Sequence, residues 1–154
     1  NMTLQFDQPY EEILVYADTQ RIRQVIINLL GNAIKYGSKN GNVQVSFEEI
    51  ENSLLQITVK DDGPGISAEH LDRIFERFYR VEKSRSKDKG GSGLGLAIVK
   101  HILSAHNTEI RVNSKVKKGT SFSFELQIAP NEADEVKEVE KTVAYKEVEG
   151  VKSD

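Results

Sequence analysis

KGGSGLGLAIVK, residues 89–100, is the stretch that decides the fold, because four glycines lead directly into an apolar run. Glycines leave backbone amides uncovered, and an apolar run after them predicts a helix whose first turn points those amides at the loop. The N-terminus of a helix also carries roughly half a positive charge. The stretch therefore predicts a phosphate-binding loop, with a plain loop-to-helix junction as the alternative.

The segment before this loop is rich in basic residues and lacks an apolar period. Seven basic residues fall within seventeen positions: Arg73, Arg77, Arg80, Lys83, Arg85, Lys87 and Lys89. We expect residues 79–92 to be mobile and to form a lid whose basic side chains close over a phosphate chain. The alternative is a solvated charged loop.

A second glycine turn, DDGPG at Asp61–Gly65, follows an alternating strand pattern. Its glycines and proline predict a sharp turn with space for a flat ligand, and a carboxylate at its start can accept a hydrogen bond from an exocyclic amine. A type II turn with solvated aspartates is the alternative.

Apolar residues at spacings of three and four from Ile22 to Ile34 predict a long helix that begins after the N-cap Asp18 and ends near Tyr36 and Gly37. Asn28, Asn32 and Lys35 share one face of it. Asparagine is a poor helix former, an amide oxygen suits Mg²⁺, and a lysine suits phosphate. A solvated helix face is the alternative.

Alternating patterns predict the strands, which precede and follow these motifs. We expect short strands at residues 3–6 and 13–16, a hairpin around residues 43–47 and 55–59, and a closing pair around residues 110–112 and 122–128. A short helix is expected at residues 68–74 and a second long one from the glycine loop to about His106. The pattern predicts an α+β fold, a two-layer sandwich with a mixed sheet of about five strands packed on three helices.

Composition is ordinary for a globular domain: 154 residues, 38% hydrophobic, 29% charged, and no cysteine for disulfide or thiol chemistry. The net charge of -3 divides unevenly, because residues 131–154 carry eight acids and four lysines and leave residues 1–130 near +1. We expect a domain at 1–130 and an acidic, disordered tail at 131–154. No run is long enough to span a membrane and no signal peptide is evident.

Four motifs in this order resemble the catalytic and ATP-binding domain of sensor histidine kinases, which share the Bergerat fold of the GHKL superfamily with gyrase, the large heat-shock chaperone and the mismatch-repair ATPases. QVIINLLGNAIKY (24–36) resembles the asparagine box and DDGPG (61–65) the first glycine box. IFERFYR (74–80) resembles the phenylalanine box and GSGLGL (91–96) the second glycine box. The resemblance covers about residues 3–128.

The resemblance implies roles for individual residues. Asn32 would coordinate Mg²⁺, with Asn28 and Lys35 near the phosphates of ATP, and Tyr36 would lie against the base. Asp61 would bind the adenine amine, Gly65 would let the ring approach, and Arg80 would reach the γ-phosphate. Asn28, Lys35 and Arg80 form the implied catalytic set. Phe75 and Phe78 are expected to anchor the lid in the core. The remaining implied nucleotide-binding residues are Gly63, Ile66, Arg77, Phe78, Gly91, Gly93, Leu94, Gly95, Leu96 and Thr120.

Three departures from the family pattern stand out. His106, Asn107 and Thr108 replace a frequent His-Gly-Gly, and Asp62 stands where Asn is common and adds negative charge near the adenine end. The third concerns the phosphoacceptor: neither His70 nor the two histidines of the second long helix has the sequence setting of a phosphoacceptor histidine.

The resemblance implies transfer of the γ-phosphate of Mg-ATP to a histidine on a separate dimerisation and phosphoacceptor domain, in two-component signal transduction with a response regulator. The alternatives are an ATPase of the superfamily, a non-catalytic nucleotide-binding module and, disfavoured by the long IFERFYR segment, a serine-directed anti-sigma kinase. We expect a soluble, monomeric, cytoplasmic domain without a nucleic-acid partner, from a dimeric kinase anchored in the inner membrane.

Overall fold

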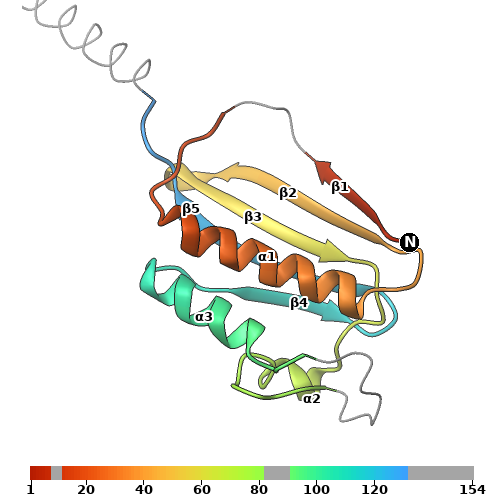
Figure 1. Cartoon of the computed structure of the whole chain (residues 1–154). Coiled ribbons are helices and arrows are strands. Elements are labelled where there is room, and N and C mark those ends of the chain that lie inside the picture. Colours follow the sequence, from red (N-terminus) through yellow and green to blue (C-terminus); the bar gives the residue numbers. More distant parts are fainter. Residues whose placement is uncertain (8–11, 82–90, 132–154) are drawn as a thin grey trace, which may run out of the picture.

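The computed structural model describes residues 1–7, 12–81 and 91–131, which form one five-stranded sheet with helices on one face (Figure 1). The strands are β1 (Thr3–Asp7), β2 (Asn42–Ile50), β3 (Leu54–Asp61), β4 (Arg111–Lys115) and β5 (Gly119–Gln127). Their order is β1-β2-β3-β5-β4. β1 runs parallel to β2 and every other pair is antiparallel, which confirms the predicted mixed sheet and its hairpin.

The three α-helices of the described residues are α1 (Thr19–Tyr36), α2 (Ala68–Leu71) and α3 (Gly95–Ala105). α1 begins as predicted, because the carboxylate of Asp18 accepts a hydrogen bond from the Arg21 backbone N–H over 3.0 Å. Its buried face consists of Ile22, Val25, Leu29 and Ala33. The spacing of three and four places these residues in one stripe against the sheet.

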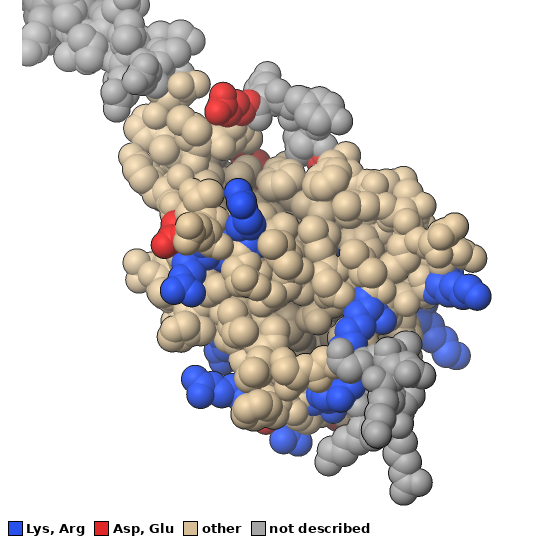
Figure 2. Space-filling model, in the orientation of Figure 1, with Lys and Arg blue, Asp and Glu red and all other residues tan. Residues whose placement is uncertain are grey.

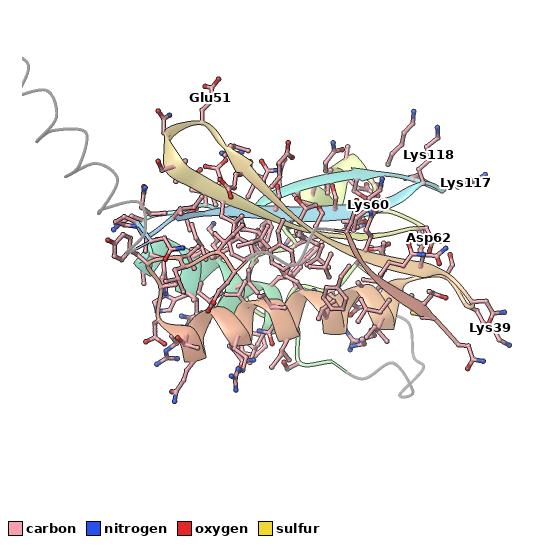
Figure 3. The ribbon with its side chains drawn as sticks, turned by 90° about the horizontal axis from the view of Figure 1, so that it is seen from above. Lys39, Glu51, Lys60, Asp62, Lys117 and Lys118 are labelled. Atoms are coloured by element: carbon pink, nitrogen blue, oxygen red, sulfur yellow. The ribbon has the colours of Figure 1, made fainter. Side chains whose placement is uncertain are left out.

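The core lies between the helical layer and the alternate residues of the central strands. Leu29 and Leu103 are fully buried on the helix side, and Phe124 is 1% exposed on β5. The opposite face of the sheet carries no helix among the described residues, and Lys60, Lys117 and Lys118 project from that side (Figure 3). The confirmed architecture is therefore an α+β sandwich of two layers.

Three local expectations need correction or restriction. Residues 13–16 form no strand, and only Val15 makes an isolated bridge to Ile128, because this segment meets the chain beyond the end of β5 rather than a full strand. α2 ends at Leu71, and hydrogen-bonded turns replace its predicted last residues. Most of the predicted lid, residues 82–90, and the predicted disordered tail, residues 132–154, lie outside the described residues.

The turn after α3 accommodates the departure from His-Gly-Gly. Asn107 has a φ of 56°, in the left-handed region that asparagine tolerates better than most residues. His106 bridges the two long helices: its Nδ1 lies 2.8 Å from the Ile102 carbonyl oxygen, and its Nε2 accepts from the Asp18 N–H over 3.1 Å. No helix of the described residues has the length and hydropathy to cross a membrane.

Candidate nucleotide-binding site

The polar face of α1 meets the start of α3 through Asn28. Its Nδ2 donates to the carbonyl oxygen of Gly95 over 3.2 Å, and its Oδ1 accepts from Gln24 Nε2 over 2.7 Å. Asn32 and Lys35 follow on the same face, and both side chains are half-buried. The structure thus brings the asparagine face and the second glycine loop together, as the sequence predicts.

Lys35 lies directly against the glycine loop. A Cβ built on Gly91 would come 2.1 Å from Lys35 Nζ, and the same Nζ lies 5.1 Å from the centre of the Tyr36 ring. The absence of a side chain at residue 91 is therefore what lets the ammonium group reach the loop. This pairing unites a cation with the backbone amides that precede α3, a combination suited to an anionic ligand.

The first turn of α3 keeps its amides available. Leu94 is the N-cap residue, and no side chain caps the helix. Ser92 Oγ accepts from the N–H of Leu94, the residue just before α3, over 3.3 Å. The N–H groups of Gly95 and Leu96 belong to the first turn, whose amides have no partner within the helix. Together with Lys35, this end of α3 can hold phosphate oxygens.

Asp61 marks the other end of the site, at the end of β3. Its Oδ1 accepts from the Gly63 N–H over 2.9 Å, and a Cβ on Gly63 would come 2.8 Å from that oxygen. Partial burial raises the pKa of Asp61 above its ordinary value, although backbone hydrogen bonds from Gly63 and Thr120 oppose the shift. A half-buried carboxylate that accepts hydrogen bonds can also accept one from an amine group of a ligand.

Thr120 pairs with Asp61 across the sheet and is 6% exposed. Its Oγ1 lies 2.8 Å from Ser114 Oγ, which also accepts from the Ile66 N–H over 2.8 Å. Sequence reasoning missed Ser114, because a serine in an alternating strand gives no sign of three tertiary contacts. This network fixes the loop after β3 to β4 and β5, and thereby places Asp61 and Ile66 together.

Two residues of the first glycine loop have structural roles besides those implied by the resemblance. Gly65 has a φ of +72°, and a Cβ there would come 2.2 Å from the Lys115 carbonyl oxygen, so β4 already requires glycine at this position. The Asp62 carboxylate accepts from the Asn42 backbone N–H over 2.9 Å and from its Nδ2 over 3.1 Å. Asp62 therefore fixes the turn before β2, although its charge also raises the pKa of Asp61.

The phenylalanine box divides in two. Phe75 packs edge-on against Phe122 with 6.3 Å between the ring centres, as expected of a core anchor. The expectation was wrong for Phe78, whose side chain is 71% exposed. Phe78 has a left-handed φ of 64° and its N–H donates to the Gly93 carbonyl oxygen over 2.9 Å, which turns its ring out of the core. Arg77 is exposed and Arg80 half-buried.

Basic side chains dominate the end of the helical face where α1 finishes and α2 lies, and acidic groups are sparse there (Figure 2). Such a field favours a polyanion. The described residues contain no group of three or more His, Asp or Glu side chains that could hold a metal ion. A cation at Asn32 would therefore need ligand oxygens from phosphate, which is how Mg²⁺ is commonly bound beside nucleotides.

The fold and these two ends define a nucleotide-binding domain of the α+β sandwich type. Residues 17–130 match the model of the family described as "Histidine kinase-, DNA gyrase B-, and HSP90-like ATPase". The chain belongs to this family of ATP-binding domains.

The curated relatives include sensor kinases. The chain is 40% identical over 128 residues to the sensor histidine kinase WalK of Bacillus subtilis. The aligned region covers 82% of this chain and 21% of WalK. It is 43% identical over 112 residues to the phosphate regulon sensor protein PhoR of Haemophilus influenzae, covering 73% of this chain and 26% of PhoR. The chain thus spans about a quarter or less of these two proteins.

Solved structures agree. The mycobacterial sensor histidine kinase MprB superposes with a TM-score of 0.69 at 28% identity, over 84% of this chain and 83% of that one. The nucleotide-free catalytic domain of histidine kinase ThkA superposes with a TM-score of 0.67 at 30% identity, over 84% and 81%. Full-length ShkA in complex with AMPPNP superposes with a TM-score of 0.70 at 30% identity, over 84% of this chain and 26% of ShkA. These likenesses identify a histidine kinase catalytic domain.

Proposed function

We propose that residues 1–130 bind Mg-ATP and transfer its γ-phosphate to a histidine on a separate dimerisation and phosphoacceptor domain. The observation that carries the proposal is that Lys35 and Asn28 meet the start of α3, together with a half-buried Asp61 in the first glycine loop. The likeness to sensor kinases that are several times longer supports an acceptor outside this chain.

The choice of kinase over ATPase rests on α1. The superfamily ATPases use a glutamate on the first long helix to activate water, and the corresponding position here is Asn28. No Asp or Glu occurs anywhere in Thr19–Tyr36. Both ends of the Asn28 amide are already engaged, by Gln24 and Gly95. Without a general base on this face, water attack on the γ-phosphate should be slow.

Catalysis would consist of positioning and charge stabilisation. Lys35 and the amides from Gly91 to Leu96 would hold the phosphate chain. Asn32 would supply an oxygen ligand to Mg²⁺, which neutralises charge on the phosphates when bound. Arg80 would stabilise the charge that develops on the transferring phosphoryl group. Asn28 would orient the start of α3 through its bond to Gly95.

The described histidines have other contacts or settings. His70 hydrogen-bonds Tyr79, and His106 bridges the two long helices. His101 is exposed on α3, without the sequence setting of a phosphoacceptor. We therefore place the acceptor on the dimerisation helices of a longer, membrane-anchored, dimeric kinase, with a response regulator as the next recipient and the cytoplasm as the site of action.

The proposal is tested by mixing the chain with Mg²⁺, γ-labelled ATP and a separately supplied dimerisation domain. Label on a histidine, stable to base and labile to acid, supports the kinase. Rapid release of free phosphate without labelled protein would favour the ATPase. Tight ATP binding with neither outcome would favour a nucleotide-binding module.

A further inference from the structure

A compact polar cluster joins α2 to the end of the phenylalanine box. The Tyr79 hydroxyl hydrogen-bonds His70 Nδ1, and the Arg73 guanidinium carbon lies 4.4 Å from the centre of the Tyr79 ring. Arg73 also pairs with Glu76, with Nη2 and Oε2 separated by 3.2 Å. Tyr79 is therefore held by a hydrogen bond at its hydroxyl and by a cation–π contact at its ring face.

The backbone around Tyr79 is held as well. The preceding residue, Phe78, donates its N–H to Gly93, and a Cβ on Gly93 would come 2.8 Å from Phe78 Cα. The Tyr79 N–H donates to the Glu76 carbonyl oxygen over 3.3 Å. The contacts of Tyr79 therefore join α2 to the segment that Phe78 holds beside the second glycine loop.

Arg80 follows Tyr79 directly, so its Cα lies only about 3.8 Å from that of Tyr79 across a trans peptide. The side chain of Arg80 is half-buried. A rotation of the Tyr79 backbone would change where the Arg80 side chain starts. Because a guanidinium acts on phosphate through directed hydrogen bonds, a small change in its origin alters its contacts.

We propose that the His70–Tyr79 hydrogen bond positions Arg80 toward the phosphate end of the site. Tyr79 and His70 are positioning residues that act through Arg80, without contact to the nucleotide. This inference rests on the proposed function, because it needs a triphosphate at the start of α3. Asp61, at the end of β3, accepts from the Gly63 N–H rather than from a residue of this cluster, so the base-binding end should not respond to the bond.

The test compares Tyr79→Phe and His70→Ala with wild type by calorimetric titration of Mg-ATP and of adenosine. Tyr79→Phe removes only the hydroxyl and keeps the ring beneath Arg73. Each variant should bind ATP about fivefold more weakly, the value of one neutral hydrogen bond, and bind adenosine unchanged. The double variant should be no weaker than either single one, because both remove the same bond.

Two further arms separate positioning from general damage. In an Arg80→Ala background, Tyr79→Phe should have no further effect on ATP affinity. Tyr16→Phe, at a tyrosine that is 61% exposed near the other end of the sheet, should leave both affinities at the wild-type value.

Unchanged ATP affinity in Tyr79→Phe and His70→Ala would overturn the inference. Equal weakening of ATP and adenosine, or a full Tyr79→Phe effect without Arg80, would overturn it too. If the wild-type chain binds adenosine but gains nothing from the triphosphate, the proposed function itself fails.

Discussion

Gly91→Ala tests whether the Lys35 ammonium group belongs to the phosphate-binding end. The new methyl group would lie 2.1 Å from Lys35 Nζ, whereas ordinary contact begins at 3.4 Å. Nζ must therefore retreat by about 1.3 Å, which the flexible lysine chain can do at little cost. Gly91 is exposed and has no left-handed φ, so the fold should accept alanine.

The loss of affinity follows from Coulomb's law. An ammonium group about 2.9 Å from a phosphate oxygen that moves to about 4.2 Å loses roughly 1.8 kcal/mol at an effective dielectric constant of about 20. That energy corresponds to about a twentyfold rise in the dissociation constant for ATP. Because lysine can rearrange, about twentyfold is the upper bound.

Calorimetric titration with Mg-ATP, ADP and adenosine measures the effect. Gly91→Ala should weaken ATP most and leave adenosine at the wild-type value, because a Cβ at residue 91 meets the Lys35 side chain and does not reach Asp61. Gly31→Ala is the matched control, since a methyl group there meets nothing within 4 Å. Wild-type ATP affinity in Gly91→Ala, with a fold intact by circular dichroism, would show that the Lys35 ammonium group does not belong to the phosphate-binding end.

Other substitutions probe the base end and the fold. Asp61→Asn should weaken ATP binding about tenfold to a hundredfold, as loss of a hydrogen bond to a charged group does, in the same titration. Because the pKa of Asp61 is raised in the folded state, its protonated form stabilises the fold, and this stability is lost as pH rises from 3.8 through the raised value. Urea unfolding at several pH values should show that the free energy of unfolding declines less with rising pH in Asp61→Asn than in wild type. The same dependence on pH in both proteins would contradict the pKa shift. Gly31→Ala should raise the unfolding free energy by up to about 1 kcal/mol, because exposed Gly31 lies mid-helix. Leu103→Ala should lower it by about 2–5 kcal/mol, and a loss below 1 kcal/mol would contradict its complete burial.

Strong periodicity made the layers of this fold predictable. The α1 stripe from Ile22 to Ala33 and the alternation in β3 and β5 each favour one burial pattern, and the structure has it. The strand predicted at 13–16 was wrong, because an alternating pattern is also compatible with a segment that pairs with the sheet at only one residue. Short patterns leave such choices to tertiary contacts.

Residue type predicts the chemistry of Lys35, Asp61 and the glycine loop, and the structure brings Lys35 beside that loop. Contacts between distant segments were not predictable, because Ser114 reaches Thr120 and Ile66 only after β4 pairs with β5. The direction of Phe78 depends on its left-handed backbone and on Gly93, neither of which an aromatic residue reveals. The contact between His70 and Tyr79 was not predictable either, because it depends on how the chain turns after α2.

Transfer of γ-labelled phosphate to a separately supplied dimerisation domain tests the central claim most directly. We expect acid-labile label on a histidine of that domain, and we expect it to be lost when Asn32 or Asp61 is replaced by alanine. Free phosphate released at the same rate with or without the acceptor domain, and no labelled histidine, would contradict it.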